Sequence, residues 1–157
     1  MFDELYETPF WVIDFLPEQV PADGEGQFFA IEKYYLKQPH RSELQKKFLD
    51  ILLKLNCYYD LEVWPLEHIN CETNPAPDVL EELMMGMDEV LNIVLPSVNS
   101  LIVTQPDDLY MTVYNPDEKL LELLQKLASA DGLYVWKPET PTEDRPISNI
   151  KKASKEG

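Results

Sequence analysis

Residues 91–118 read LNIVLPSVNSLIVTQPDDLYMTVYNPDE, and this stretch decides the fold. Three short segments in it, 91–95, 101–104 and 109–114, are rich in branched and other apolar residues. Two turn sequences, PSVN and QPDD, separate these segments. Apolar segments of this length between turn-forming residues are typical of strands joined by short connections. The stretch therefore predicts an antiparallel meander of three strands.

The end of this stretch predicts the start of a helix. Asn115 is a suitable N-cap, Pro116 suits the first helical position, and Glu118 is an acid in the first turn. Leucines at helical spacing continue the pattern as far as Gly132. A last short strand is expected at 133–136 because aromatic and branched residues follow the glycine.

The residues before the meander predict strands alternating with helices. Apolar residues 11–16, closed by a proline, predict a buried strand, and alternation at 57–64 predicts a second one. Helical spacing of apolar side chains predicts helices at 27–37, from a Ser42 cap to residue 55, and at 77–85. The first of these helices has little polar face, and Phe28, Ile31 and Tyr35 share one side of it.

This order of elements lacks the regular alternation of a doubly wound sheet, so we expect an α+β fold. The simplest architecture is a single, largely antiparallel sheet of about five or six strands with helices packed on one face. Residues 1–137 should form one globular domain, because this length can bury a substantial core. Residues 138–157 are polar and rich in charge, and we expect a flexible C-terminal tail there.

The charge of the chain is strongly acidic and unevenly distributed. The 157 residues contain 13 Lys+Arg and 29 Asp+Glu, for a formal net charge of −16. Residues 1–32 carry eight acids, and the 64 residues of 55–118 carry thirteen, and neither stretch contains a Lys or Arg. Such stretches cannot neutralise themselves, so we expect a negative face on the folded chain. Such a face attracts cationic partners, and it argues against binding nucleic acid or anionic membranes.

Several function classes are excluded by what the sequence lacks. The five glycines do not have the spacing of a dinucleotide-binding fingerprint or a phosphate-binding loop, so no nucleotide cofactor is expected. No apolar run is long enough to cross a bilayer. The first residues are acidic where a signal peptide would be basic, so we expect a cytoplasmic protein. Two cysteines are too few for a disulfide scaffold.

Strand alternation and the turn acids give a candidate partner-binding set. Tyrosine and tryptophan are favoured at protein interfaces, and an open sheet face lined by them and by acids suits a basic protein partner. The set comprises Tyr58, Asp60, Glu62, Trp64, Asp107, Asp108, Tyr110 and Tyr114. The same aromatic side chains could instead pack beneath loops or in a homodimer interface.

Asp14 stands out because it interrupts the apolar segment 11–16. A buried carboxylate needs a hydrogen bond or a charged partner, so Asp14 is our buried-acid candidate. Together with Asp60 and Glu62 it could also form a carboxylate cluster for acid–base or metal chemistry.

Metal and cysteine chemistry have little support. Cys57, His68 and Cys71 do not show the paired short spacings of common zinc modules, so no metal site is predicted. Three functional hypotheses remain. The preferred one is a non-enzymatic acidic module that docks on a basic protein. The others are a carboxylate- or metal-dependent enzyme and a homo-oligomer that buries its tyrosine-bearing sheet face.

Overall fold

The computed structural model describes residues 2–21, 26–66, 70–86 and 89–139. Over these residues the chain forms a seven-stranded sheet with the strand order β3-β2-β4-β5-β6-β1-β7. Every pair of neighbouring strands is antiparallel. The expected α+β class with one antiparallel sheet is confirmed, and the strand count is slightly higher than expected. The strands are β1 (Phe10–Asp14), β2 (Glu62–Pro65), β3 (Glu72–Thr73), β4 (Leu91–Leu95), β5 (Ser100–Thr104), β6 (Tyr110–Tyr114) and β7 (Tyr134–Trp136).

The predicted meander forms the centre of the sheet. β4 pairs with β5, and β5 pairs with β6. A short 3-10 turn, η1 (Pro96–Val98), joins β4 to β5 and ends at Asn99, whose φ of 50° is left-handed. Asparagine tolerates that conformation better than most residues, so the turn residue expected from sequence also closes the hairpin.

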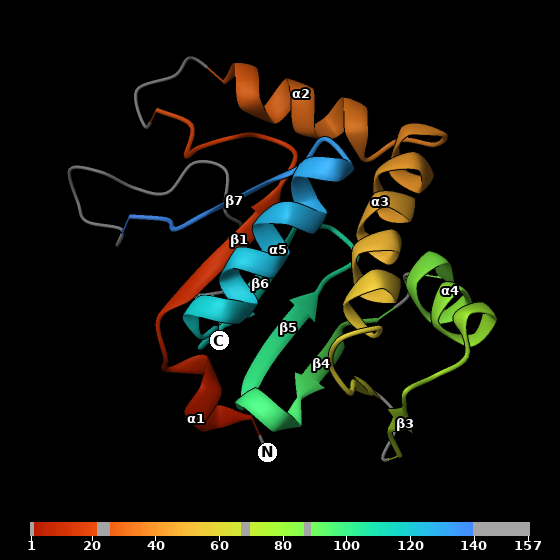
Figure 1. Cartoon of the computed structure of the whole chain (residues 1–157). Helices are drawn as coiled ribbons and strands as arrows, with labels where there is room; N and C mark the ends of the chain where they lie inside the picture. The colour runs from red at the N-terminus through yellow and green to blue at the C-terminus, as the bar shows by residue number, and fades with distance from the viewer. Residues whose placement is uncertain (1, 22–25, 67–69, 87–88, 140–157) are drawn as a thin grey trace.

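Two long helices cover one face of the sheet. These are α3 (His40–Leu55) and α5 (Glu118–Ala130), with α4 (Pro77–Gly86) packed beside α3 (Figure 1). The predicted stripe of α3 is buried, including Phe48, Ile51 and Leu52. It joins one large apolar cluster with the helix-facing side chains of the strands. Each such side chain stabilises the fold by roughly 1.5–3 kcal/mol.

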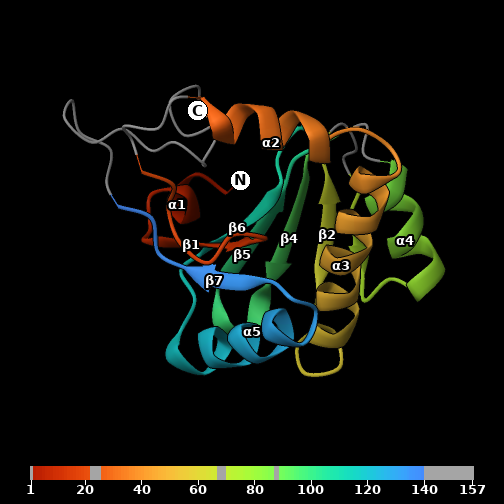
Figure 2. The same ribbon diagram turned by 90° about the horizontal axis from the view of Figure 1, so that it is seen from above.

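The opposite face is covered in part by α1 (Asp3–Tyr6), a helix that the sequence analysis did not predict (Figure 2). Leu5 is buried there against Leu101 and Val103. A second small cluster on this face contains Val12, Tyr110 and Trp136. Four helical residues lie below the length at which apolar periodicity can be recognised, so tertiary packing decides this helix.

The predicted strand at 57–64 is wrong in its first half. The residues after α3 form a tight turn, in which the amides of Tyr58 and Tyr59 both donate to the carbonyl of Leu55 at 2.9 and 3.0 Å. The side-chain amide of Asn56 donates to the Tyr59 carbonyl at 3.0 Å and closes this turn. Extended pairing starts only at Glu62. Tyr58 and Tyr59, which alternation assigned to a strand, therefore lie in the turn that ends α3.

Two predicted helix caps are also corrected. Ser42 lies inside α3, and its amide and hydroxyl both donate to Oε1 of Gln38, at 3.2 and 2.6 Å. At α5 the N-cap is Asp117, whose Oδ1 accepts the amide of Leu120 at 2.7 Å. Asn115 instead adopts a left-handed φ of 58°. The chain reverses at Asn115 before the helix starts, which moves the cap two residues along.

The helix α2 (Gln27–Tyr35) leaves several of its apolar side chains exposed. Ile31 is 47% exposed, Phe29 is 65% exposed, and the buried residue of the helix is Glu32. The helix lies across one end of the sheet (Figure 1), and its last residue, Tyr35, packs against the ring of Phe15 and the main apolar cluster. None of the helices in the described ranges combines the length and apolar composition needed to cross a membrane.

Candidate functional site

The cation-free stretch 55–118 builds one side of the sheet. It supplies β3, β2, β4, β5 and β6, which are five neighbouring strands, together with α4. The next strand, β1, comes from the other cation-free stretch, 1–32. Six adjacent strands therefore contribute no Lys or Arg side chain, and neither does α1, which covers them.

Acids gather along the segment that runs from the start of β2 through β3 to α4, at one end of the sheet order, and we call them the acidic edge. We define it by six carboxylate residues: Asp60, Glu62, Glu72, Asp78, Glu81 and Glu82. All of them are exposed except Glu62, which is partly exposed. β3 pairs with β2 at the end of the sheet order, and α4 follows β3 after three residues (Figure 1).

The three acids of α4 share one face of the helix. Asp78, Glu81 and Glu82 fall at i, i+3 and i+4, whereas the buried Leu80 and Met84 face the core. Like charges at this spacing destabilise a helix by a few tenths of a kcal/mol, and the last turn of α4 carries no basic residue to offset them. Asp78 in the first turn suits the positive end of the helix dipole, whereas Glu81 and Glu82 lie beyond that turn and gain less from it.

Side chains of the turn and β2 tie the edge together. The side-chain amide of Asn74 donates to Oδ1 of Asp60 at 3.0 Å. Its carbonyl oxygen accepts the backbone amide of Leu61 and the side-chain amide of Asn56, both at 2.9 Å. Asn74 has a left-handed φ of 46°, which lets one side chain reach all three groups. Among the residues that the structure describes, the carboxylate of Asp60 is therefore held by a hydrogen bond and pairs with no cation.

Two lysines of α3 are directed away from the acidic edge. Lys54 pairs with Asp131 at the end of α5, with 3.7 Å between Nζ and Oδ2. The ammonium of Lys47 lies next to Gly132, directly after α5. Because α3 lies between α4 and α5, both lysines point to the side that α4 does not occupy (Figure 1). Lys47 and Lys54 therefore lie away from the carboxylates of α4.

The expected open, tyrosine-lined sheet face is closed in part by the chain's own N-terminus. Register does place Trp64, Asn92 and Tyr114 on this face together with Glu62. Phe2 packs edge-on against Trp64 with ring centroids 6.0 Å apart, and Tyr6 packs against Tyr114 at 5.3 Å.

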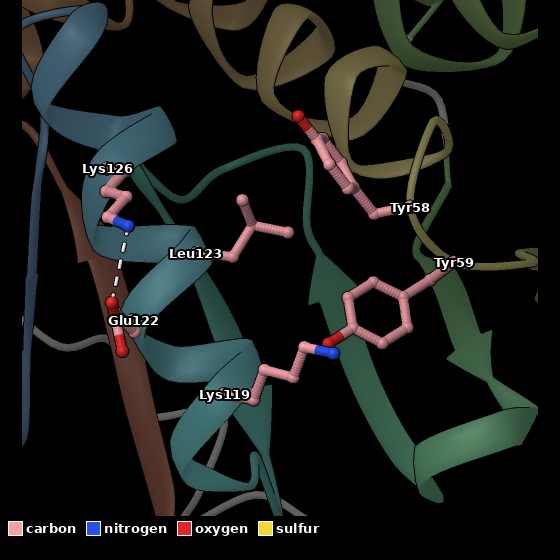
Figure 3. A pocket seen from close by; sticks show the side chains of 6 residues that line it. All are labelled: Tyr58, Tyr59, Lys119, Glu122, Leu123 and Lys126. Carbon is pink, nitrogen blue, oxygen red and sulfur yellow. Dashed lines mark ion pairs between the residues drawn. The ribbon is translucent and has the colours of Figure 1, made fainter.

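The remaining predicted tyrosines also differ in position from the expectation. Tyr110 is only 5% exposed in the cluster with Val12 and Trp136, so its ring is not a contact surface. Tyr58 is not on a strand, and its ring lies on the helix side of the molecule, facing α5 (Figure 3). The predicted set is thus divided between the two sides of the sheet.

The tyrosines beneath α1 have raised pKa values. Burial, and next the neighbouring Tyr6, raises the pKa of Tyr114 to about 12. Burial and the charge of Asp3 raise the pKa of Tyr6, against a smaller opposing effect of its hydrogen bond to Asn92. Both hydroxyls are neutral at physiological pH, and they pack as structural groups.

Asp107 and Asp108 do not belong to the acidic edge. They lie in the loop between β5 and β6, and the register places this loop at the end of the sheet opposite Glu62. Asp107 is exposed and Asp108 is buried. The guanidinium of Arg41, in the first turn of α3, donates to the carbonyl of Pro106 in the same loop at 3.3 Å. A cation therefore accompanies these two acids.

Asp14 is buried, as its surroundings in the sequence predict. Its carboxylate is 2% exposed and accepts the backbone amide of Phe15 at 2.8 Å. The proposed cluster of Asp14 with Asp60 and Glu62 is wrong, because β4, β5 and β6 lie between β1 and β2. At a strand spacing of about 4.8 Å this separation is roughly 19 Å.

No metal-binding cluster is found among the described residues. No three His, Cys, Asp or Glu side chains lie close enough together there to hold a metal ion. Cys57 is an exposed free thiol and Cys71 is a partly exposed one. His68 lies outside the described residues. Comparison of the chain with family models, curated proteins and solved structures finds no match.

Proposed function

We propose that the protein is a non-enzymatic binding module that docks a basic protein partner on its acidic edge. The observation that carries this proposal is the exposed face of α4, where three carboxylates gather without a nearby basic residue of their own helix. Asp60 and Glu72 extend the negative surface beside α4, whereas Glu62 lies on the other face of β2 together with Trp64. Among the residues named from sequence, Asp60 keeps this role, and α4 supplies the larger part.

Electrostatics gives the edge a physical use. Complementary charge raises the rate at which partners meet and disfavours partners of the wrong sign. The same field repels phosphate backbones, so nucleic acid is not an expected partner. The cost is self-repulsion in the free protein, which a cationic partner relieves on docking. The cytoplasmic location and the homodimer remain predictions from the sequence.

The test compares two variants of equal charge. Glu81→Gln with Glu82→Gln neutralises the acidic edge, and Glu43→Gln with Glu118→Gln removes the same charge from exposed positions on α3 and α5. A lysine-rich decapeptide serves as the basic probe, and its binding is measured at about 20 and 150 mM salt, where the screening lengths differ roughly threefold.

The proposal predicts that the edge variant weakens peptide binding more than the control variant does. It also predicts that a pull-down with the wild-type chain at low salt retains a basic protein that the edge variant loses. Equal losses in the two variants, or no retained basic protein even at low salt, would refute docking at this edge.

A further inference from the structure

A cavity of about 430 Å³ lies between α5 and the turn that follows α3. It is lined by Tyr58, Tyr59, Lys119, Glu122, Leu123 and Lys126 (Figure 3). Its volume is in the range of sites that hold small molecules. The cavity lies on the helix side of the sheet and shares no residue with the acidic edge.

The cavity gathers cations in a chain that has few of them. Lys119 and Lys126 are seven residues apart on α5, which places them on one face about 10 Å apart along the axis. Lys126 pairs with Glu122 at 3.3 Å, but both side chains are more than half exposed, so this pair is weak. Within the described part of the chain, Lys119 has neither an ion pair nor a hydrogen bond.

The opposite wall offers two aromatic rings with hydroxyl groups. Tyr58 is 68% exposed, and Tyr59 extends from the turn toward Lys119 (Figure 3). Neither hydroxyl has a hydrogen-bond partner among the residues that the structure describes. Burial and the charge of Asp117 raise the pKa of Tyr59, so its hydroxyl keeps its proton at neutral pH and can donate it. Leu123 supplies an apolar surface between the two walls (Figure 3).

We propose that this cavity binds a small aromatic anion, a planar ring that carries a phosphate or carboxylate group. The anionic group lies at Lys119, where the ammonium and the Tyr59 hydroxyl both donate hydrogen bonds. The ring packs on Tyr58 and Leu123, because aromatic and apolar surfaces favour such contact. The proposal is independent of docking at the acidic edge.

The net charge of −16 does not prevent this binding. At physiological ionic strength charges are screened over about 8 Å, so acids on distant surfaces contribute little at the cavity. Charge-assisted hydrogen bonds from a lysine act at contact distance, where screening is weakest. Two acids are local: Glu122 pairs with Lys126, and the charge of Asp117 acts on Tyr59, so the preference for an anion depends on Lys119.

The test is a titration of the full chain at about 150 mM salt with phenyl phosphate, followed by NMR. The matched probes are inorganic phosphate, which lacks the ring, phenol, which lacks the charge, and benzylamine, which carries the opposite charge. Phenyl phosphate should shift the Leu123 methyl and the Tyr58 and Tyr59 ring signals in a saturable way. Each of the other probes should bind at least about tenfold more weakly, because each loses one kind of contact.

Substitutions of single lysines test where the anionic group binds. Lys119→Met should weaken phenyl phosphate binding about tenfold, and Lys119→Arg should retain it, because a hydrogen bond to a charged group is worth about one such factor. Lys33→Met on α2 removes the same charge from an exposed site outside the cavity and should leave the affinity unchanged. The edge variant Glu81→Gln with Glu82→Gln should also bind phenyl phosphate normally.

Three results would overturn the cavity proposal. These are equal losses in Lys119→Met and Lys33→Met, equal binding of phenyl phosphate and benzylamine, or shifts confined to residues outside the cavity. A failure of peptide docking by the edge variant would leave phenyl phosphate binding intact, so the two proposals can fail separately.

Discussion

The hydroxyl of Tyr6 donates a hydrogen bond of 2.6 Å to Oδ1 of Asn92, 86 positions further along the chain. Asn92 is 3% exposed in β4, so this bond satisfies a buried amide from a helix that covers the sheet. It anchors α1 to the strand next to β2. This hydrogen bond holds α1 over the sheet face that strand alternation predicted to be open.

Removing that hydroxyl should weaken the fold. Tyr6→Phe leaves the Asn92 oxygen without its donor, at a cost of about 1 kcal/mol, because Tyr6 is 41% exposed and water can replace part of the bond. Urea unfolding measures the change. Tyr134→Phe, on an exposed side chain at the sheet edge, is the control and should leave stability unchanged. Equal stability of Tyr6→Phe and wild type would show that the bond contributes nothing.

Alkaline pH should destabilise the protein through Tyr114. In the unfolded chain this hydroxyl ionises near pH 10.0, and burial in the folded protein raises its pKa to about 12. The unfolded state therefore loses its proton first, and the free energy of unfolding falls as pH rises from about 10 to 12. The Tyr114→Phe variant cannot ionise, so its stability should fall less over that range. Denaturant curves at pH 8, 10 and 11 compare the two chains, and parallel curves would contradict the prediction.

The helix α5 should depend on Asp117 and not on Asn115 for its cap. Asp117→Ala removes the acceptor for the Leu120 amide and should cost about 1 kcal/mol. Asp117→Ser keeps an acceptor of similar reach and should restore most of the stability. Thermal unfolding of the two variants provides the comparison. A Ser variant as unstable as the Ala variant would mean that the carboxylate acts in another way.

Charge reversal on α4 should separate stability from binding. Glu82→Lys places a cation four residues after Asp78, which replaces a repulsive pair by an attractive one worth about 0.2–0.5 kcal/mol. The variant should be as stable as wild type or slightly more so, and it should bind the lysine-rich peptide more weakly. Unfolding midpoints and peptide affinity are measured on the same sample. A gain in peptide binding would contradict the role of the acidic edge.

Truncation should test the domain boundary expected near residue 137. The last described contacts of the chain are from the Trp136 indole to the Leu16 carbonyl at 3.0 Å and from the Glu139 amide to Gln19 at 2.9 Å. A chain that ends at Glu139 should therefore unfold within about 2 °C of the full chain, a difference of roughly half a kcal/mol. A chain that ends at Leu133 lacks β7 and the buried Trp136 ring, and it should unfold far earlier. A large loss in the longer truncation would place structural residues in the tail.

Much of the fold could be predicted from sequence because its signals are local. Alternating apolar residues between proline- and asparagine-rich turns specify the meander of β4, β5 and β6. The apolar stripe of α3 and the leucine pattern of α5 specify two amphipathic helices. The burial of Asp14 could also be predicted, because its neighbours on both sides are apolar. The segregation of charge into long cation-free stretches is a property of the sequence alone.

The candidate site could be predicted only in part. Asp60 and Glu62 lie at the acidic edge. Asp107 and Asp108, which were predicted with them, lie at the other end of the sheet. The acids of α4 were not among the predicted site residues. The signal that could have identified α4 is the i, i+3, i+4 spacing of its acids opposite Leu80 and Met84. The cavity at Lys119 carries no such signal, since its two walls are about sixty residues apart in the chain.

By itself the sequence determined the strands and helices with strong local patterns, the antiparallel class and the surplus of negative charge. Tertiary structure alone decided the strand order, the packing of α1 over the tyrosines, the turn that replaces the first half of a predicted strand, and the packing of α4 beside α3. The physical reason is the range of the interactions. Alternation and capping act between residues a few positions apart, whereas strand order and surface charge depend on contacts between segments that only the folded chain brings together.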